Sequence, residues 1–216
     1  MDACIIIRNA TIADIDFIVE TIINAEKNGT ERCGFSNTFA LSIDETKDYI
    51  KQMLEEEIDG CEFSIDSFRI LEIDRNPVAA IAIWIEGQNS SEQTSAFLKS
   101  NLISYILPKD KISHAASMSS VVNGIQIARS ENAMQIEYVY CRPQYRGHGY
   151  MYKLLKECTD TSNADIIEVQ TFGEDTPAVR LYEKLGFKIT KEFISDNPDT
   201  IKYFPSNKKL LMTIKK

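Results

Sequence analysis

The chain opens with a short apolar run at residues 4–8, which predicts a strand, and continues with a segment of helical periodicity. In residues 12–27 the apolar side chains recur at the spacing of one helix face, namely at Ile15, Ile18, Val19 and Ile22. Residues 28–39 interrupt the pattern with Gly, Asn and Thr, and we expect a loop there.

Ser42 and Glu45 have the spacing of a capping box, so a second helix is predicted to start there and to run to about Glu57. Two apolar runs follow, at residues 67–74 and 77–86. Their composition and the short polar break between them predict two strands joined by a tight turn.

Residues 87–131 give a less regular pattern. Residues 90–107 have enough apolar positions to form a helix, which Pro108 is expected to end. Residues 113–129 fit no single element. Because neither a repeat nor a linker is visible, we expect one domain over residues 1–216.

The last third of the chain alternates between strand and helix patterns. Strands are predicted at residues 132–141, 164–172, 187–194 and 208–215. One helix is expected over residues 147–159, and another begins at Thr176 and Pro177 and ends at Gly186. The chain is therefore predicted to be a mixed α/β protein.

Composition narrows the possible roles of such a protein. The 216 residues carry a net charge of −8, which argues against broad nucleic-acid binding. No apolar stretch is long enough to span a membrane, and the N-terminus does not resemble a signal peptide. The five cysteines lack metal-type spacing, so we expect free thiols, no metal and a cytoplasmic location.

A glycine-rich turn lies where a predicted strand meets a predicted helix. Gly147 and Gly149 are one residue apart, and Gln144, Arg146 and His148 supply polar or basic side chains around them. The first turn of a helix exposes unpaired N–H groups and carries partial positive charge, while glycine allows a ligand to approach the backbone. The turn therefore predicts an anion cradle suited to a pyrophosphate.

Two other phosphate-binding loops fit less well. A Walker A loop needs Lys and Ser or Thr after its last glycine, and here Tyr150 and Met151 follow. A dinucleotide-binding fingerprint needs a third glycine where the chain has Tyr152.

Two motifs together resemble the GNAT acyltransferase superfamily. The stretch "QYRGHG" (144–149) matches its Gln/Arg-x-x-Gly-x-Gly/Ala signature, and "DTPAVRLYEKLGF" (175–187) is similar to its second motif, with Asp175 in place of the usual Asn. The resemblance implies a mostly antiparallel central sheet flanked by helices. Residues 87–131 would then form an unusually long insert between the third and fourth strands.

The resemblance also implies a site for acetyl-CoA and an amine acceptor, with no metal. The implied coenzyme-binding residues are Val139, Tyr140, Cys141, Gln144, Tyr145, Arg146, Gly147, His148, Gly149 and Asp175. The acceptor would be a small-molecule or peptide amine, not a nucleic acid or a membrane, and the protein a monomer or homodimer. Phe35, Phe39 and Tyr203 fall in segments that flank the acceptor in such folds.

Amine acetylation requires a proton acceptor, because an alkylamine of pKa about 10.4 needs about 4.6 kcal/mol to reach its neutral form at pH 7. Glu137 is the candidate base, and strand alternation predicts that it shares one face with Val139 and Cys141. It could instead pair with a basic neighbour. The resemblance assigns Tyr182 to the departing thiolate, although an aromatic at that position could simply pack.

Several alternatives remain open at this level. Cys141 could act as a nucleophile, although cysteine is a small hydrophobic residue that is often simply buried. The protein could be an acyl-CoA-binding sensor without turnover. The segment 87–131 could pack beside the acceptor entrance, decorate a remote edge, or form a dimer contact.

Overall fold

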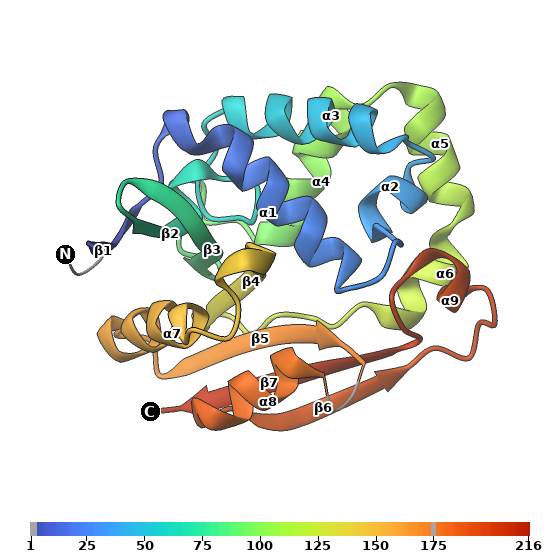
Figure 1. Ribbon diagram of the computed structural model, residues 1–216. Helices are drawn as coiled ribbons and strands as arrows, with labels where there is room; N and C mark the ends of the chain where they lie inside the picture. Colours follow the sequence, from blue (N-terminus) through green and yellow to red (C-terminus); the bar gives the residue numbers. More distant parts are fainter. Residues whose placement is uncertain (1–3, 174–175) are drawn as a thin grey trace.

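The computed structural model describes residues 4–173 and 176–216. Its strands are β1 (Ile5–Asn9), β2 (Phe68–Ile73), β3 (Asn76–Ile85), β4 (Met134–Cys141), β5 (Ile166–Phe172), β6 (Lys188–Ile194) and β7 (Lys208–Lys215). They form one sheet in the order β1-β2-β3-β4-β5-β7-β6, antiparallel except for the β4–β5 pair (Figure 1). The predicted fold class is confirmed.

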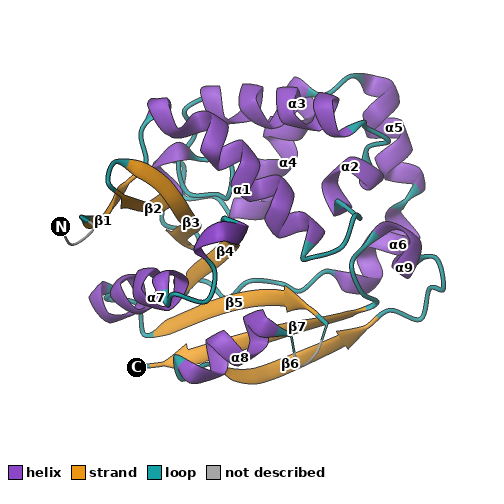
Figure 2. Ribbon diagram, viewed as in Figure 1, coloured by secondary structure: helices purple, strands orange, loops and turns teal. Residues whose placement is uncertain are grey.

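Helices cover both faces of this sheet (Figure 2). They are α1 (Ile15–Lys27), α2 (Gly34–Thr38), α3 (Ile43–Glu55), α4 (Ser95–Ile106), α5 (Lys109–Ser117), α6 (Ser119–Val122), α7 (Tyr150–Thr161), α8 (Pro177–Lys184) and α9 (Thr200–Tyr203), with 3-10 turns η1 (Ile12–Asp14), η2 (Ile65–Ser67), η3 (Asn123–Ile125) and η4 (Pro143–Tyr145). The core beneath α1 and α3 includes Phe63 and Phe68, and the core beneath α7 and α8 includes Leu154. Within the described ranges, no helix is long and apolar enough to cross a bilayer.

The centre of the sheet opens between β4 and β5. These two strands pair only over residues 134–136 and 167–169. Beyond that point β4 bulges: Glu137 lies opposite Ala82 and Tyr140 opposite Ala80, so two residues of β4 face one residue of β3. Tyr138, at the bulge, has a φ of 50°. A bulge bends its strand, and here the bend accompanies the separation of β4 from β5.

The bulge overturns the predicted alternation along β4. Tyr138 and Tyr140 point into the core beneath α1, whereas Val139 and Cys141 pack with the core beneath α7. Glu137 lies just before the bulge and on the α1 side, where it meets Arg129. The prediction that Glu137 shares a face with Val139 and Cys141 is wrong, because the extra residue shifts the alternation by one position.

The long segment 87–131 is largely helical and packs on the α1 side of the molecule. Pro108 ends α4, as predicted, and also begins α5. Helix α4 packs against α3, while α6 and η3 form a small core with Phe204. The predicted loop at residues 28–39 contains the short helix α2, because Phe35 and Phe39 bury their rings in the core beneath α1.

Candidate active site

A cavity of about 110 Å³ lies at the opening between β4 and β5. Its wall combines residues of α1, β4, β5, α8 and β7: Ala25, Glu26, Asn28, Ile136, Glu137, Tyr138, Val139, Val169, Gln170, Thr171, Phe172, Ala178, Tyr182 and Lys209. Glu137, predicted from its place on the strand, and Tyr182, predicted from the second motif, therefore line one space. The β5-facing edge of β4 at Val139 has no strand partner, since pairing with β5 stops at residue 136.

The glycine turn that follows β4 has an open backbone. Gly147 and Gly149 have φ values of 82° and 79°, and a Cβ built on either would meet no atom within 4 Å. Gly149 is the N-cap of α7, so the helix starts at Tyr150, three residues later than predicted. This exposed helix N-terminus fits the pyrophosphate of a coenzyme A thioester.

The basic side chains of the turn are positioned by local contacts. Arg146 donates from Nε to the carbonyl of Cys141 at 2.9 Å. His148 stacks on Tyr150 with 5.7 Å between ring centroids and remains exposed, as does Gln144. The side chains of Arg146 and His148 are therefore both accessible to an anion.

The remaining predicted coenzyme contacts differ in exposure. Tyr140 is buried beneath α1, and Tyr145 is half-buried against the α7 core. Cys141 is also half-buried, and this burial raises the pKa of its thiol. A thiol with a raised pKa stays protonated and is a poor nucleophile. Asp175 lies outside the described residues.

Tyr182 is held on α8 by its cap and by ring packing. The Thr176 side chain accepts the N–H of Val179, which starts α8 as predicted. The Tyr182 ring packs edge-on against Phe187 with centroids 5.8 Å apart. Burial and the nearby Glu137 raise the pKa of the phenol well above its ordinary value. The hydroxyl consequently keeps its proton at neutral pH and can donate it to a hydrogen bond.

Glu137 is fixed by an arginine from the long segment before β4. Arg129 donates from Nη2 to Glu137 Oε1 at 2.8 Å and to Glu62 Oε1 at 3.2 Å. Its Nη1 donates to Ser95 Oγ at 2.9 Å, and its guanidinium lies 4.9 Å from the ring centroid of Trp84. The ion pair foreseen as an alternative for Glu137 is present, while Glu137 still lines the cavity.

Glu62 connects this pair to a second cation of the same segment. Lys99 on α4 donates to Glu62 Oε1 at 2.9 Å, and Glu62 is almost fully buried. Burial alone would raise the pKa of Glu62, but Arg129 and Lys99 outweigh it and lower the pKa. Within the described part of the chain, Glu62 Oε2 and Arg129 Nε are buried without a hydrogen-bond partner.

Two charged residues of the cavity wall were not predicted. Glu26, near the end of α1, accepts the N–H of Phe35 at 3.2 Å, and burial raises its pKa. Lys209 on β7 lies 5.4 Å from the ring centroid of Phe172, and burial lowers its pKa. Neither residue belongs to a motif, and only the tertiary fold brings the two together.

The predicted acceptor aromatics do not line this cavity. Phe35 and Phe39 pack on each other at 4.8 Å within the core beneath α1. Tyr203 lies in α9, where its carbonyl accepts the side-chain amide of Asn37 at 2.6 Å. None of the three residues lines the cavity.

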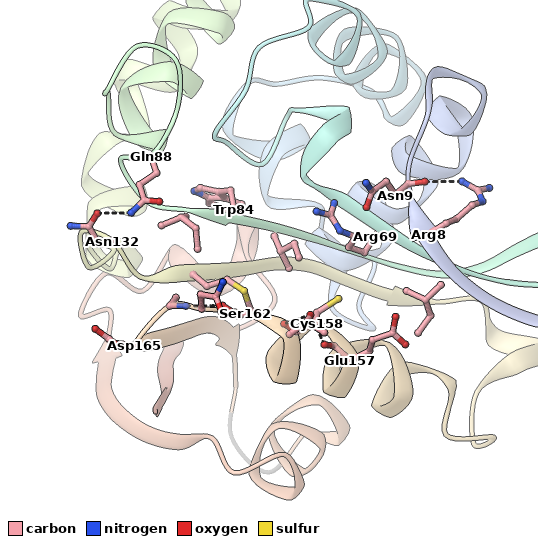
Figure 3. Close-up of a pocket in the computed structure, with 17 residues that line it drawn as sticks. Arg8, Asn9, Arg69, Trp84, Gln88, Asn132, Glu157, Cys158, Ser162 and Asp165 are labelled. Carbon is pink, nitrogen blue, oxygen red and sulfur yellow. Dashed lines mark hydrogen bonds between the residues drawn. The ribbon is translucent and has the colours of Figure 1, made fainter.

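A larger pocket of about 660 Å³ is shown in Figure 3; it lies near the start of β4, and no residue of the glycine turn lines it. Its two arginines are already engaged: Arg8 pairs with Asp14 and Glu72, and Arg69 donates to backbone carbonyls. None of the predicted site residues lines it. Size alone therefore does not make it the active site. Among the described residues, no group of three or more His, Cys, Asp or Glu could hold a metal ion.

Solved structures resemble this architecture at low sequence identity. An N-acetyltransferase from Staphylococcus aureus Mu50 is 15% identical, with a TM-score of 0.70 over 97% of this chain and 100% of that chain. An acetyltransferase from Salmonella typhimurium solved with acetyl-CoA is 12% identical, with a TM-score of 0.50 over 98% and 93%. An agmatine N-acetyltransferase is 10% identical, with a TM-score of 0.59 over 98% and 99%.

The sequence itself carries the family relationship. No curated protein sequence matches the chain significantly. The sequence profile described as "Acetyltransferase (GNAT) family" matches residues 40–187, a range that includes the glycine turn, β4 and Tyr182. This match covers more than half of the chain and agrees with the fold of the neighbours. The chain belongs to the acetyltransferase (GNAT) family.

Proposed function

We propose that this protein transfers an acetyl group from acetyl-CoA to a primary amine by direct attack. The observation that carries this proposal is the meeting of Glu137 and Tyr182 at one cavity, beside the unpaired edge of β4. Glu137 on β4 and Tyr182 on α8 would supply the two proton roles that amide formation from a thioester needs. Acetyl-CoA supplies the activated acyl group.

Glu137 is proposed as the proton acceptor on the amine side. Arg129 holds Oε1, whereas no hydrogen bond within the described residues engages Oε2, so one oxygen is anchored and the other is available. As the C–N bond forms, the amine loses a proton to this carboxylate, directly or through water. The bulge in β4 favours this role. It leaves Glu137 on the α1 face of the sheet, whereas Val139 and Cys141 pack on the other face, against the core beneath α7.

Tyr182 is proposed to assist the leaving sulfur. As the C–S bond breaks, the phenol donates a hydrogen bond to the developing thiolate, which then takes up a proton. The raised pKa of Tyr182 keeps the donor protonated, and a hydrogen bond that strengthens as charge develops does not require complete proton transfer. No described hydrogen-bond partner within the protein competes for this hydroxyl.

The glycine turn would hold the coenzyme pyrophosphate. The open backbone at Gly147 and Gly149 and the exposed Arg146 fit a dianionic group, and the free edge of β4 at Val139 fits an amide-containing arm. Cys141 plays no covalent part in this proposal, because its raised pKa disfavours the thiolate.

The proposal is tested by amine-dependent release of CoA. Purified protein is mixed with acetyl-CoA and a panel of amines, and free thiol and acetylated product are measured together. We expect both to appear in equal amounts, with no acetyl adduct on the protein by mass spectrometry. Tight binding of acetyl-CoA with no amine-dependent release would support a sensor instead, and a chaseable adduct on Cys141 would establish a two-step mechanism.

A further inference from the structure

The cavity wall contains a lysine whose carboxylate neighbours, Glu137 and Glu26, act on it through longer-range attraction and not as ion pairs. Lys209 lines the cavity from β7, and within the described residues its ammonium forms no ion pair. The ammonium lies over the ring of Phe172, which is itself stacked on Phe204 with centroids 6.1 Å apart. Burial lowers the pKa of Lys209 because a cation here lacks solvent. An anion brought by a ligand would relieve this cost.

The other cations near the cavity are already neutralised. Lys99 and Arg129 share Glu62, and Arg129 also pairs with Glu137. This network leaves them little attraction for a further anion. Lys209 is therefore the cation of the cavity wall best able to bind one.

The two side-chain amides of the wall each already donate one hydrogen bond to the backbone, and the Tyr182 hydroxyl is assigned to the leaving sulfur in the proposed reaction. The amide nitrogen of Asn28 donates to the carbonyl of Phe172 at 3.2 Å, and that of Gln170 donates to the carbonyl of Ile127 at 3.1 Å. An anionic group entering the cavity would consequently find its strongest free donor at Lys209.

Glu26, which also lines the cavity, would orient such a ligand. Glu26 accepts one backbone N–H and forms no ion pair with Lys209, although both line the same space. An amine would be attracted toward Glu26 and Glu137, and an anion toward Lys209. A diamine without an anionic group would place its second cation against Lys209, which is unfavourable in a cavity of low dielectric.

We propose that the acceptor carries an anionic group, a carboxylate or a phosphate, close to its reacting amine, and that Lys209 binds this group. This inference rests on the proposed acetyl transfer and names the acceptor class as small amino-acid-like or aminophosphate compounds. Lys209 is then a specificity-determining residue, and Glu26 contributes to the orientation of the amine.

The inference is tested with pairs of acceptors that differ only in the anionic group. Arginine is compared with agmatine, lysine with cadaverine, tyrosine with tyramine, and phosphoethanolamine with ethanolamine. We expect kcat/KM for the anionic member of at least one pair to exceed that of its partner by about tenfold or more, the usual scale for one charged contact. The carboxylate and phosphate arms identify which anion is used.

Substitution of the lysine locates the effect. Lys209→Met should lower kcat/KM for the anionic acceptor by about tenfold, mainly through KM. For the member of the pair that lacks the anionic group, kcat/KM should stay within about threefold of the wild-type value. The control is Lys208→Met, on the same strand, whose ammonium pairs with Glu192 at 3.0 Å. This control should change neither member of the pair.

Three results would overturn the inference. The first is that the wild-type protein acetylates the members without the anionic group with equal or higher kcat/KM. The second is that it acetylates no anionic member. The third is that Lys209→Met lowers kcat/KM equally for both members of a pair. Acetylation of plain amines with any of these results would leave the proposed acetyl transfer standing. Failure of every amine to release CoA would count against the proposed function itself.

Discussion

At the scale of single residues, the catalytic proposal depends on whether Tyr182 acts or only packs. Tyr182 contributes to the core beneath α8 and also lines the cavity that Glu137 lines. Phenylalanine retains the ring contact with Phe187 and removes only the oxygen. The substitution therefore separates packing from chemistry.

We predict that Tyr182→Phe lowers kcat by about 100- to 1,000-fold, the range found when one transition-state donor is removed. The dissociation constant of acetyl-CoA, measured by calorimetry, should change by less than about threefold, because the hydroxyl acts on charge that develops only during the reaction. Wild-type turnover in a folded Tyr182→Phe protein would show that the residue has a packing role alone.

At the scale of elements, the strand-to-helix turn between β4 and α7 is predicted to provide the coenzyme site. Gly147→Glu should abolish acetyl-CoA binding by calorimetry, since the new side chain introduces a negative charge and bulk where the pyrophosphate would lie. Its Cβ would meet no atom within 4 Å, so only the strain of a positive φ, about 1–2 kcal/mol, should reach stability.

The matched control for this turn is Gly186→Glu, which has a φ of 96° and equally open surroundings at the end of α8. Both variants should lose similar stability in urea unfolding, while only Gly147→Glu should lose the ligand. Equal affinity for acetyl-CoA in the two proteins would remove the turn from coenzyme binding.

A second element-scale prediction concerns the segment that precedes β4. Arg129→Met should lower kcat by about tenfold or more, because Glu137 loses the contact that orients it. The control is Lys99→Met, which also leaves Glu62 with one cation fewer but does not touch Glu137. Both variants should be destabilised, by about 3–5 kcal/mol if each leaves a buried charge uncompensated.

The comparison of these two proteins distinguishes orientation from stability. Steady-state kinetics are measured well below both melting temperatures, and Arg129→Lys is included as the conservative replacement. An equal fall of kcat in Arg129→Met and Lys99→Met would indicate that the network only stabilises the fold.

At the scale of the whole molecule, the buried network gives stability a specific pH dependence. Glu62 has a folded-state pKa that is lowered, because Arg129 and Lys99 outweigh the effect of burial. Its stabilising contribution is therefore complete above the unfolded-state pKa of about 4.3 and is lost as pH falls through the lower folded value. We predict that the free energy of unfolding, measured in urea, decreases below about pH 4 and that the decrease is smaller in Glu62→Gln.

Local interactions account for what the sequence alone could predict. The capping box of Ser42 and Glu45, the cap at Thr176, and the glycines of the cradle act within a few residues of themselves. The helical and strand periods depend only on which face of an element is apolar. These short-range rules located every strand of the sheet and, with the motifs, the candidate residues Tyr182 and Glu137.

Only the tertiary structure decided how those residues meet. The bulge at Tyr138 depends on register against β3, and it reversed the predicted face of Glu137. Arg129 binds Glu62, which is 67 positions away in the sequence. Glu26 and Lys209 line one cavity only because α1 and β7 converge at the opening of the sheet. Contacts between residues so distant in sequence leave no local pattern, because the energy that selects them comes from packing and burial of the complete fold.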